Sequence, residues 1–155
     1  MVEIGGKPIL WHIMERYARF GFNQFVLPLG YRGSIIKQYF HDYKFRNANF
    51  TINLGTGDIT PHDTAASVDW QITLCDTGEN TEKGARIKRV AGHLGSGPFM
   101  VTYGDGVADI DIAALLRFHK SHGRIGTFTG VRIPSRFGTV NMKQEFPTYS
   151  SAFRV

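Results

Sequence analysis

Apolar runs and helically spaced apolar residues alternate along this chain, with glycine-containing polar loops between them. Residues 25–29 form an apolar run that predicts a strand, and the loop 30–33 follows it. Ser34 is then placed to cap a helix. The apolar positions of that helix are Ile35, Ile36, Tyr39 and Phe40. This stretch therefore predicts a strand, a loop and a helix in that order.

The same order of patterns occurs twice more. Residues 70–75 predict a strand, which runs into the polar loop 76–81 and a basic helix start at 84–90. Residues 99–103 predict a buried strand that stops on Gly-Asp-Gly, and from Asp111 apolar residues again recur at helical spacing. Asp109 or Asp111 is available as the N-cap of this helix. Strands that alternate with helices indicate an α/β fold with a mostly parallel sheet and right-handed crossovers.

The remaining segments give weaker signals. A helix is expected after Pro8, closed by Gly21. Residues 50–54 alternate as a half-buried strand, and 55–69 form a polar stretch that we expect to be an exposed excursion. Residues 126–131 predict a further strand, with a turn at 134–138 before 139–142.

Composition favours one globular domain in a reducing compartment. The chain has 155 residues, 42% of them hydrophobic, and no apolar segment of the length that a membrane span needs. The single Cys75 cannot form an intramolecular disulfide, so we expect a cytoplasmic protein. The net charge of +5 comes from scattered basic residues with one cluster at 83–89, which suits a small phosphorylated ligand better than nucleic acid.

Asp105 is the candidate metal ligand. It follows the predicted strand 99–103, and loops at the carboxyl ends of parallel strands line the ligand crevice of such folds. Gly104 and Gly106 would allow close approach. Mg²⁺ prefers one or two carboxylates together with substrate phosphates. The alternative is that Asp105 belongs to a tight turn or caps a helix.

Arg86 is the candidate phosphate ligand. It lies at a helix start after a polar loop and before the Asp105 strand. The alternative is that Arg86 lies on a solvated helix face. No phosphate-binding P-loop or hydrolase triad accompanies it, because Lys7 is followed by proline and Gly95-Ser96-Gly97 has the wrong spacing for a nucleophile elbow.

Together these segments closely resemble the sugar-phosphate nucleotidyltransferases, and in particular their cytidylyl-transferring branch. The Tyr-Gly-Asp-Gly-Val-Ala-Asp run is the motif specific to that branch. The matching stretches are residues 1–14, Gly30-Tyr31-Arg32-Gly33, Asp76-Thr77-Gly78, residues 84–90, residues 103–111 and Arg136-Phe137-Gly138.

The resemblance implies a Rossmann-like fold and the synthesis of CDP-glucose and pyrophosphate from CTP and glucose 1-phosphate with Mg²⁺, for the deoxysugars of surface polysaccharides. Asp105 would bind the metal, Gly104 would contact substrate, Arg86 would hold nucleotide or phosphate, Thr81 would lie against the nucleotide, and Gly138 would approach the sugar. We further expect a homo-oligomer when the protein is complete, and neither nucleic acid nor membrane as a partner.

The resemblance covers residues 1–145, a partial nucleotidyltransferase domain, and leaves 146–155 as an unmatched tail. The family's first strand with its Gly-rich phosphate loop would lie upstream of Met1, and a second metal aspartate would lie beyond the last residue. We therefore expect an internal fragment with little or no catalytic activity. The alternative function is a non-catalytic remnant that binds nucleotide or sugar phosphate, or that acts as an interaction domain.

Overall fold

The computed structural model describes residues 2–62 and 68–130 of the chain. The chain divides into two compact units, Met1–Asp109 and Ile110–Val155, which are taken separately below. Within the described residues, no helix is both long and apolar enough to cross a membrane.

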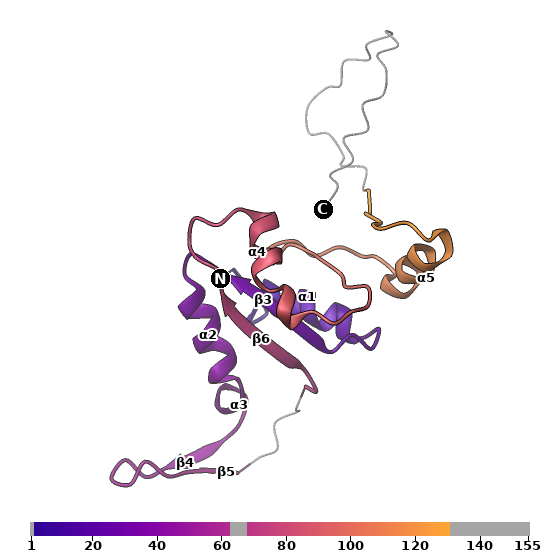
Figure 1. Ribbon diagram of the computed structural model, residues 1–155. Coiled ribbons are helices and arrows are strands. Elements are labelled where there is room, and N and C mark those ends of the chain that lie inside the picture. The colour runs from indigo at the N-terminus through magenta and orange to yellow at the C-terminus, as the bar shows by residue number, and fades with distance from the viewer. Residues whose placement is uncertain (1, 63–67, 131–155) are drawn as a thin grey trace, which may run out of the picture. The chain divides into compact units, whose positions relative to one another are not determined.

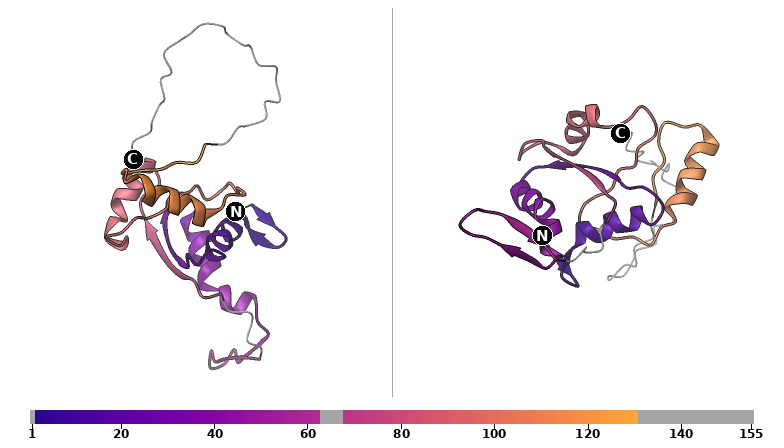
Figure 2. Two further views of the ribbon diagram at one scale, coloured as in Figure 1. Left: turned by 90° about the vertical axis from the view of Figure 1, so that its right-hand side faces the viewer. Right: turned by 90° about the horizontal axis from the view of Figure 1, so that it is seen from below.

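Two parallel strands form the centre of the first unit. β3 (Gln24–Leu29) pairs with β6 (Gln71–Asp76), in a register that runs from Gln24 opposite Gln71 to Leu29 opposite Asp76. Both strands therefore end at the same edge. The α/β class and the parallel pairing expected from the sequence are confirmed. α1 (Ile9–Ala18) and α4 (Lys83–Arg89) lie on opposite sides of this pair (Figures 1 and 2).

The helix predicted after Pro8 is α1, which begins at the next residue. A small antiparallel hairpin precedes it, made by β1 (Glu3–Ile4) and β2 (Lys7–Pro8). Gly5 and Gly6 form the turn with φ angles of 57° and 75°, a region that side chains with a Cβ rarely adopt. Ile13 and Met14 of α1 are buried and anchor the helix in the core. The other buried apolar residues of this unit are Pro8, Leu29, Tyr39 and Val90.

The second helix begins two residues earlier than its sequence indicates. α2 (Gly33–His41) has Arg32 at its N-cap position instead of Ser34, and Arg32 adopts a left-handed conformation with φ of 54°. Gly33 is buried against Leu29, and a Cβ at residue 33 would lie 2.9 Å from the Leu29 Cβ. A glycine at the helix start therefore allows α2 to pack tightly on β3.

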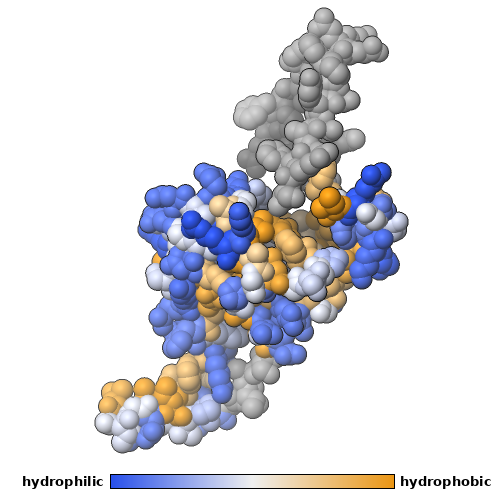
Figure 3. Space-filling view, in the orientation of Figure 1, coloured by the Kyte–Doolittle hydropathy of each residue, from blue (hydrophilic) through white to orange (hydrophobic). Residues whose placement is uncertain are grey.

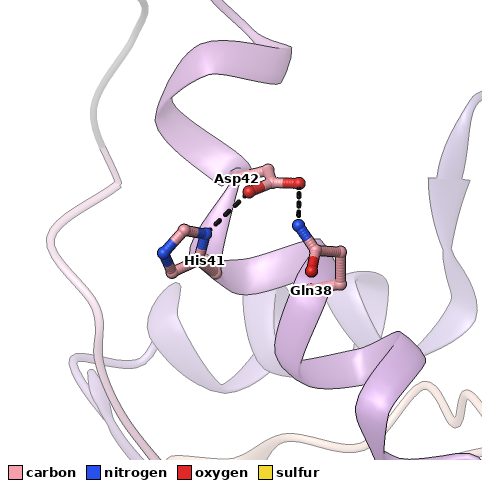
Figure 4. Close-up of polar contacts among 3 residues, drawn as sticks. All are labelled: Gln38, His41 and Asp42. Carbon is pink, nitrogen blue, oxygen red and sulfur yellow. Dashed lines mark hydrogen bonds and ion pairs between the residues drawn. The ribbon is translucent and has the colours of Figure 1, made fainter. Parts of the chain in front are cut away.

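The end of α2 carries a cluster of three polar residues. Asp42 accepts hydrogen bonds from His41 Nδ1 (2.7 Å) and Gln38 Nε2 (2.5 Å) through its two carboxylate oxygens (Figure 4). The bond from His41 and then that from Gln38 hold the pKa of Asp42 below its usual value. The short helix α3 (Tyr43–Arg46) follows directly. In the same region burial raises the pKa of Tyr39.

A hairpin extends from the body of the first unit (Figure 1). β4 (Phe50–Ile52) pairs antiparallel with β5 (Ile59–Pro61). The sequence prediction of a half-buried strand over 50–54 was wrong in extent and in burial, because both strands of the hairpin are exposed. Exposed apolar side chains lie along this hairpin (Figure 3); they are Phe50, Ile52, Leu54 and Ile59.

The strand predicted at residues 99–103 is absent. This segment has no ladder partner within the described residues, and the side chains of Phe99 and Tyr103 are exposed. An apolar run encodes a preference for burial, whereas a strand also needs a neighbour with which to exchange backbone hydrogen bonds. The segment before it contains α4 and the short helix η1 (Ala91–His93).

The second unit is built around α5 (Ile112–His122). Of the two candidate caps, Asp109 and Asp111, it is Asp111 that caps the helix, since its carboxylate accepts a hydrogen bond of 2.8 Å from the Ala114 amide. Gly123 ends the helix with φ of 61°. Residues 126–130 form no strand, contrary to expectation, and Val131 lies outside the described residues. The predicted turn at 134–138, the segment 139–142 and the unmatched tail 146–155 also lie outside the described residues.

Candidate functional site

The ends of the two parallel strands are joined at a single carbonyl oxygen. Thr77 follows β6, and both its backbone amide and its hydroxyl donate to the Leu29 carbonyl at the end of β3, each at 2.8 Å. Thr77 is the one polar residue that is buried in the described part of the chain, with 2% of its surface exposed. This is the edge of the sheet at which the sequence predicted a ligand crevice.

Arg86 is inserted between these strand ends. Its Nη1 donates to the Leu29 carbonyl (3.1 Å) and to the Thr77 hydroxyl (2.8 Å), and its Nη2 donates to the Glu79 carbonyl (2.8 Å). Three of the five N–H hydrogens of the guanidinium are therefore engaged by the protein, which leaves the Nε hydrogen and one Nη2 hydrogen. Arg86 is half-buried, so its position differs from the solvated helix face of the alternative interpretation.

Gly30 makes room for the guanidinium. A Cβ at residue 30 would lie 2.5 Å from both Nη1 and Nη2 of Arg86. The glycine-rich loop after β3 thus has a specific steric function, which is to let an arginine from α4 approach the backbone.

Thr81 and Arg89 complete the network from the other side of the same loop. The Thr81 hydroxyl donates to the Thr77 carbonyl at 2.5 Å, and Arg89 Nη1 donates to the Thr81 hydroxyl at 2.6 Å. Arg89 Nη1 also contacts the Thr77 carbonyl. The Thr81 hydroxyl has therefore given its only hydrogen to the protein, but it retains acceptor capacity. In this state it suits an N–H or O–H group of a ligand better than a phosphate oxygen.

Gly78 allows the loop to close on itself. Its φ is 83°, and a Cβ at this position would lie 3.0 Å from the Thr81 hydroxyl and 3.1 Å from Arg89 Nη1. The Gly78 amide donates to the Asp76 carboxylate at 2.9 Å, which fixes the turn after β6.

Gly104 and Asp105 lie in an exposed loop of the same unit. Within the described residues Asp105 has no hydrogen bond or ion pair, and no cluster of three carboxylate, histidine or cysteine side chains forms a metal site. Lys83 at the start of α4 contacts Tyr103, with its Nζ 3.3 Å from the phenolic oxygen and 5.0 Å from the ring centroid. This contact links α4 to the residue directly before Gly104.

The structure thus brings together Arg86 and Thr81, two of the predicted site residues, through their shared partner Thr77. Asp105 and Gly104 are linked to the same helix only through the contact between Lys83 and Tyr103. Gly138 lies outside the described residues. Sequence reasoning did not identify Thr77 as a site residue, although a hydroxyl residue directly after a strand, at the start of a strand-to-helix loop, was an available signal.

Comparison with known proteins relates the chain to nucleotidyltransferases, although no family model matches it. It is 43% identical over 144 residues to the glucose-1-phosphate cytidylyltransferase of Salmonella typhimurium, a match that covers 92% of this chain and 56% of that protein. A probable glucose-1-phosphate cytidylyltransferase of Bacillus subtilis is 40% identical over 143 residues, with the same coverage of 92% and 56%. The chain spans about half the length of these curated relatives.

A more distant relative transfers a different nucleotide. The mannose-1-phosphate guanylyltransferase catalytic subunit beta of Dictyostelium discoideum is 31% identical over 147 residues, which is 94% of this chain and 35% of that protein. The resemblance drawn from the sequence motifs is confirmed by these relatives, over nearly the whole chain.

Proposed function

We propose that this chain provides the nucleotide-binding part of a glucose-1-phosphate cytidylyltransferase, an enzyme that makes CDP-glucose and pyrophosphate from CTP and glucose 1-phosphate. The observation that carries the proposal is the 43% identity over 92% of the chain to a glucose-1-phosphate cytidylyltransferase. The network of Arg86, Thr77 and Thr81 at the strand ends gives this proposal a physical basis.

The reaction forms a bond between a phosphate oxygen of glucose 1-phosphate and the α-phosphorus of CTP, and it breaks the bond to the β-phosphate. Such transfers depend on positioning and on neutralising negative charge on the phosphoryl oxygens. The two unengaged N–H hydrogens of Arg86 are available for a phosphate oxygen. Because the Thr81 hydroxyl retains only acceptor capacity, we assign it to the base or ribose of the nucleotide.

Asp105 is the residue that would hold Mg²⁺. Its carboxylate is exposed and unengaged in the described chain, with a glycine on each side, and it fits an ion that takes few protein ligands and completes its shell with phosphate oxygens and water. The metal would neutralise charge on the triphosphate. Gly104 would allow the substrate close approach to the backbone, and Gly138 would lie near the sugar.

The relatives contain further residues that have no counterpart in this chain. We therefore propose nucleotide binding for the chain itself, and transfer for a protein in which the remaining elements of the site are present. A cytoplasmic location and a homo-oligomeric assembly are further parts of this proposal. The product would serve the synthesis of surface-polysaccharide sugars.

Calorimetric titration with CTP in the presence of Mg²⁺ tests the proposal. The unaltered chain should show saturable binding that is lost in Arg86→Ala. Arg117→Ala is the matched control, because it removes the same charge from an exposed position on α5. Absence of saturable CTP binding by the unaltered chain, or equal loss in both variants, would contradict the proposal.

A second candidate function is binding to another protein without catalysis. The observation that favours it is the exposed apolar segment 99–103, in which Phe99 and Tyr103 are 51% and 64% exposed. Calorimetric titration with CTP separates the two functions, because a domain that only binds another protein shows no saturable binding of CTP.

A further inference from the structure

Thr77 uses every polar atom that it has. Its amide and its hydroxyl hydrogen go to the Leu29 carbonyl, and its hydroxyl oxygen accepts from Arg86 Nη1 at 2.8 Å. Its carbonyl oxygen accepts from the Thr81 hydroxyl and from Arg89. A buried residue with 2% exposure thus holds three side chains that come from the loop 77–82 and from α4.

The two polar ends of Thr77 act on different partners. The hydroxyl fixes the Arg86 guanidinium. It accepts one hydrogen bond from Arg86 Nη1, and the Leu29 carbonyl accepts the other. The carbonyl fixes the rotamer of Thr81 by accepting its hydrogen. The donor and acceptor atoms left for a ligand on Arg86 and Thr81 are therefore determined by Thr77.

We propose that Thr77 is a positioning residue of the nucleotide site, which acts on the ligand only through Arg86 and Thr81. This inference rests on the proposed function. Thr77 is too deeply buried to touch a nucleotide, so its effect on binding must pass through the orientation of its partners.

Removal of the hydroxyl alone tests this role. Thr77→Val conserves the branched shape of the side chain but leaves Arg86 without one of its acceptors. The Leu29 carbonyl keeps the Thr77 amide as a donor, so the pairing of β3 and β6 should persist. Thr77→Ser restores the hydroxyl, and Thr60→Val is the matched control, since Thr60 is exposed in the hairpin.

Two measurements are made on each variant of the whole chain. CTP is titrated in the presence of Mg²⁺, and the side-chain N–H signals of Arg86 are recorded by NMR on ligand-free protein, assigned with Arg86→Lys. We expect Thr77→Val to weaken CTP binding about tenfold and to shift the Arg86 signals, because a hydrogen bond to a charged donor is lost. Thr77→Ser should bind within about threefold of the unaltered chain and keep those signals.

The outcomes separate this inference from the proposed function. If the unaltered chain binds CTP and Thr77→Val binds it equally well, the positioning role is wrong and the proposed function stands. If Thr77→Val leaves the Arg86 signals in place, or if Thr77→Ser fails to restore binding, the hydroxyl does not act through Arg86. If the unaltered chain binds no CTP, the proposed function is overturned and the positioning role falls with it, whatever the Arg86 signals show.

Discussion

The guanidinium of Arg86 lies over Gly30 so closely that a Cβ at residue 30 would come within 2.5 Å of both its terminal nitrogens. Residues from the loop after β3 and from α4 thus share one space at the carboxyl end of the parallel pair. The flexible end of the arginine side chain, and not the backbone, is what a larger residue at position 30 would displace.

Gly30→Ala should therefore expel the guanidinium from its three acceptors. We expect a loss of about 1–3 kcal/mol in the free energy of unfolding, typical of overpacking, together with a loss of CTP binding. Chemical denaturation and CTP titration measure the two effects. Gly92→Ala is the control, because a Cβ there meets nothing within 4 Å. Equal stability of the two variants would show that Arg86 adjusts at no cost.

Arg86→Lys should impair CTP binding nearly as much as Arg86→Ala. Lysine keeps the charge but lacks the planar fork that reaches the Leu29 carbonyl, the Thr77 hydroxyl and the Glu79 carbonyl at once. Both variants should lose about 1–3 kcal/mol of stability, measured by denaturation with urea. If lysine binds CTP as well as arginine does, charge alone is sufficient and the fork has no role.

Asp105→Asn should remove the dependence of CTP binding on Mg²⁺ and leave stability unchanged. The carboxylate is exposed and unengaged in the described chain, so its removal costs no internal interaction. The measurement is a CTP titration with and without Mg²⁺. Asp69→Asn removes the same charge from another exposed position and should keep the response to Mg²⁺. A persistent Mg²⁺ effect in Asp105→Asn would place the metal elsewhere.

Asp42 should contribute to stability in a pH-dependent manner. Its pKa in the folded chain is lowered by hydrogen bonds from His41 and Gln38, so the folded state favours the carboxylate. This stabilisation is present above the unfolded value of about 4 and is lost as the pH falls through the lower folded value.

Thermal unfolding between about pH 2 and 6 measures this effect, since that window spans the titration of carboxylates. Asp42→Asn should flatten the decline of the melting temperature on the acid side, and His41→Ala should flatten it in part, because His41 is the larger of the two causes. Superimposable acid profiles for Asp42→Asn and the unaltered chain would refute the role of these hydrogen bonds.

The sequence by itself determined the elements whose signals are local. The helix after Asp111 was predicted together with two candidate caps, one of which is the observed Asp111. Such signals are local, because a helix makes its hydrogen bonds within its own segment and the cap lies three residues from its donor. The strands β3 and β6 were predicted from apolar runs, and the parallel direction of the sheet followed from the alternation of strands with helices. Short sequence motifs, among them those at 84–90 and 103–111, identified the relationship to nucleotidyltransferases.

Tertiary structure alone decided which atoms these elements bring together. The segment 99–103 has the composition of a buried strand, yet a strand requires a partner and the described chain offers it none. Arg86 was predicted as a phosphate ligand, but only the folded chain reveals that the Leu29 carbonyl, Thr77 and Glu79 engage three of its hydrogens. Leu29 is 57 positions from Arg86 in the sequence, and no sequence periodicity encodes a contact at that separation. Side-chain hydrogen bonds of this kind are fixed by the packing of whole helices and strands.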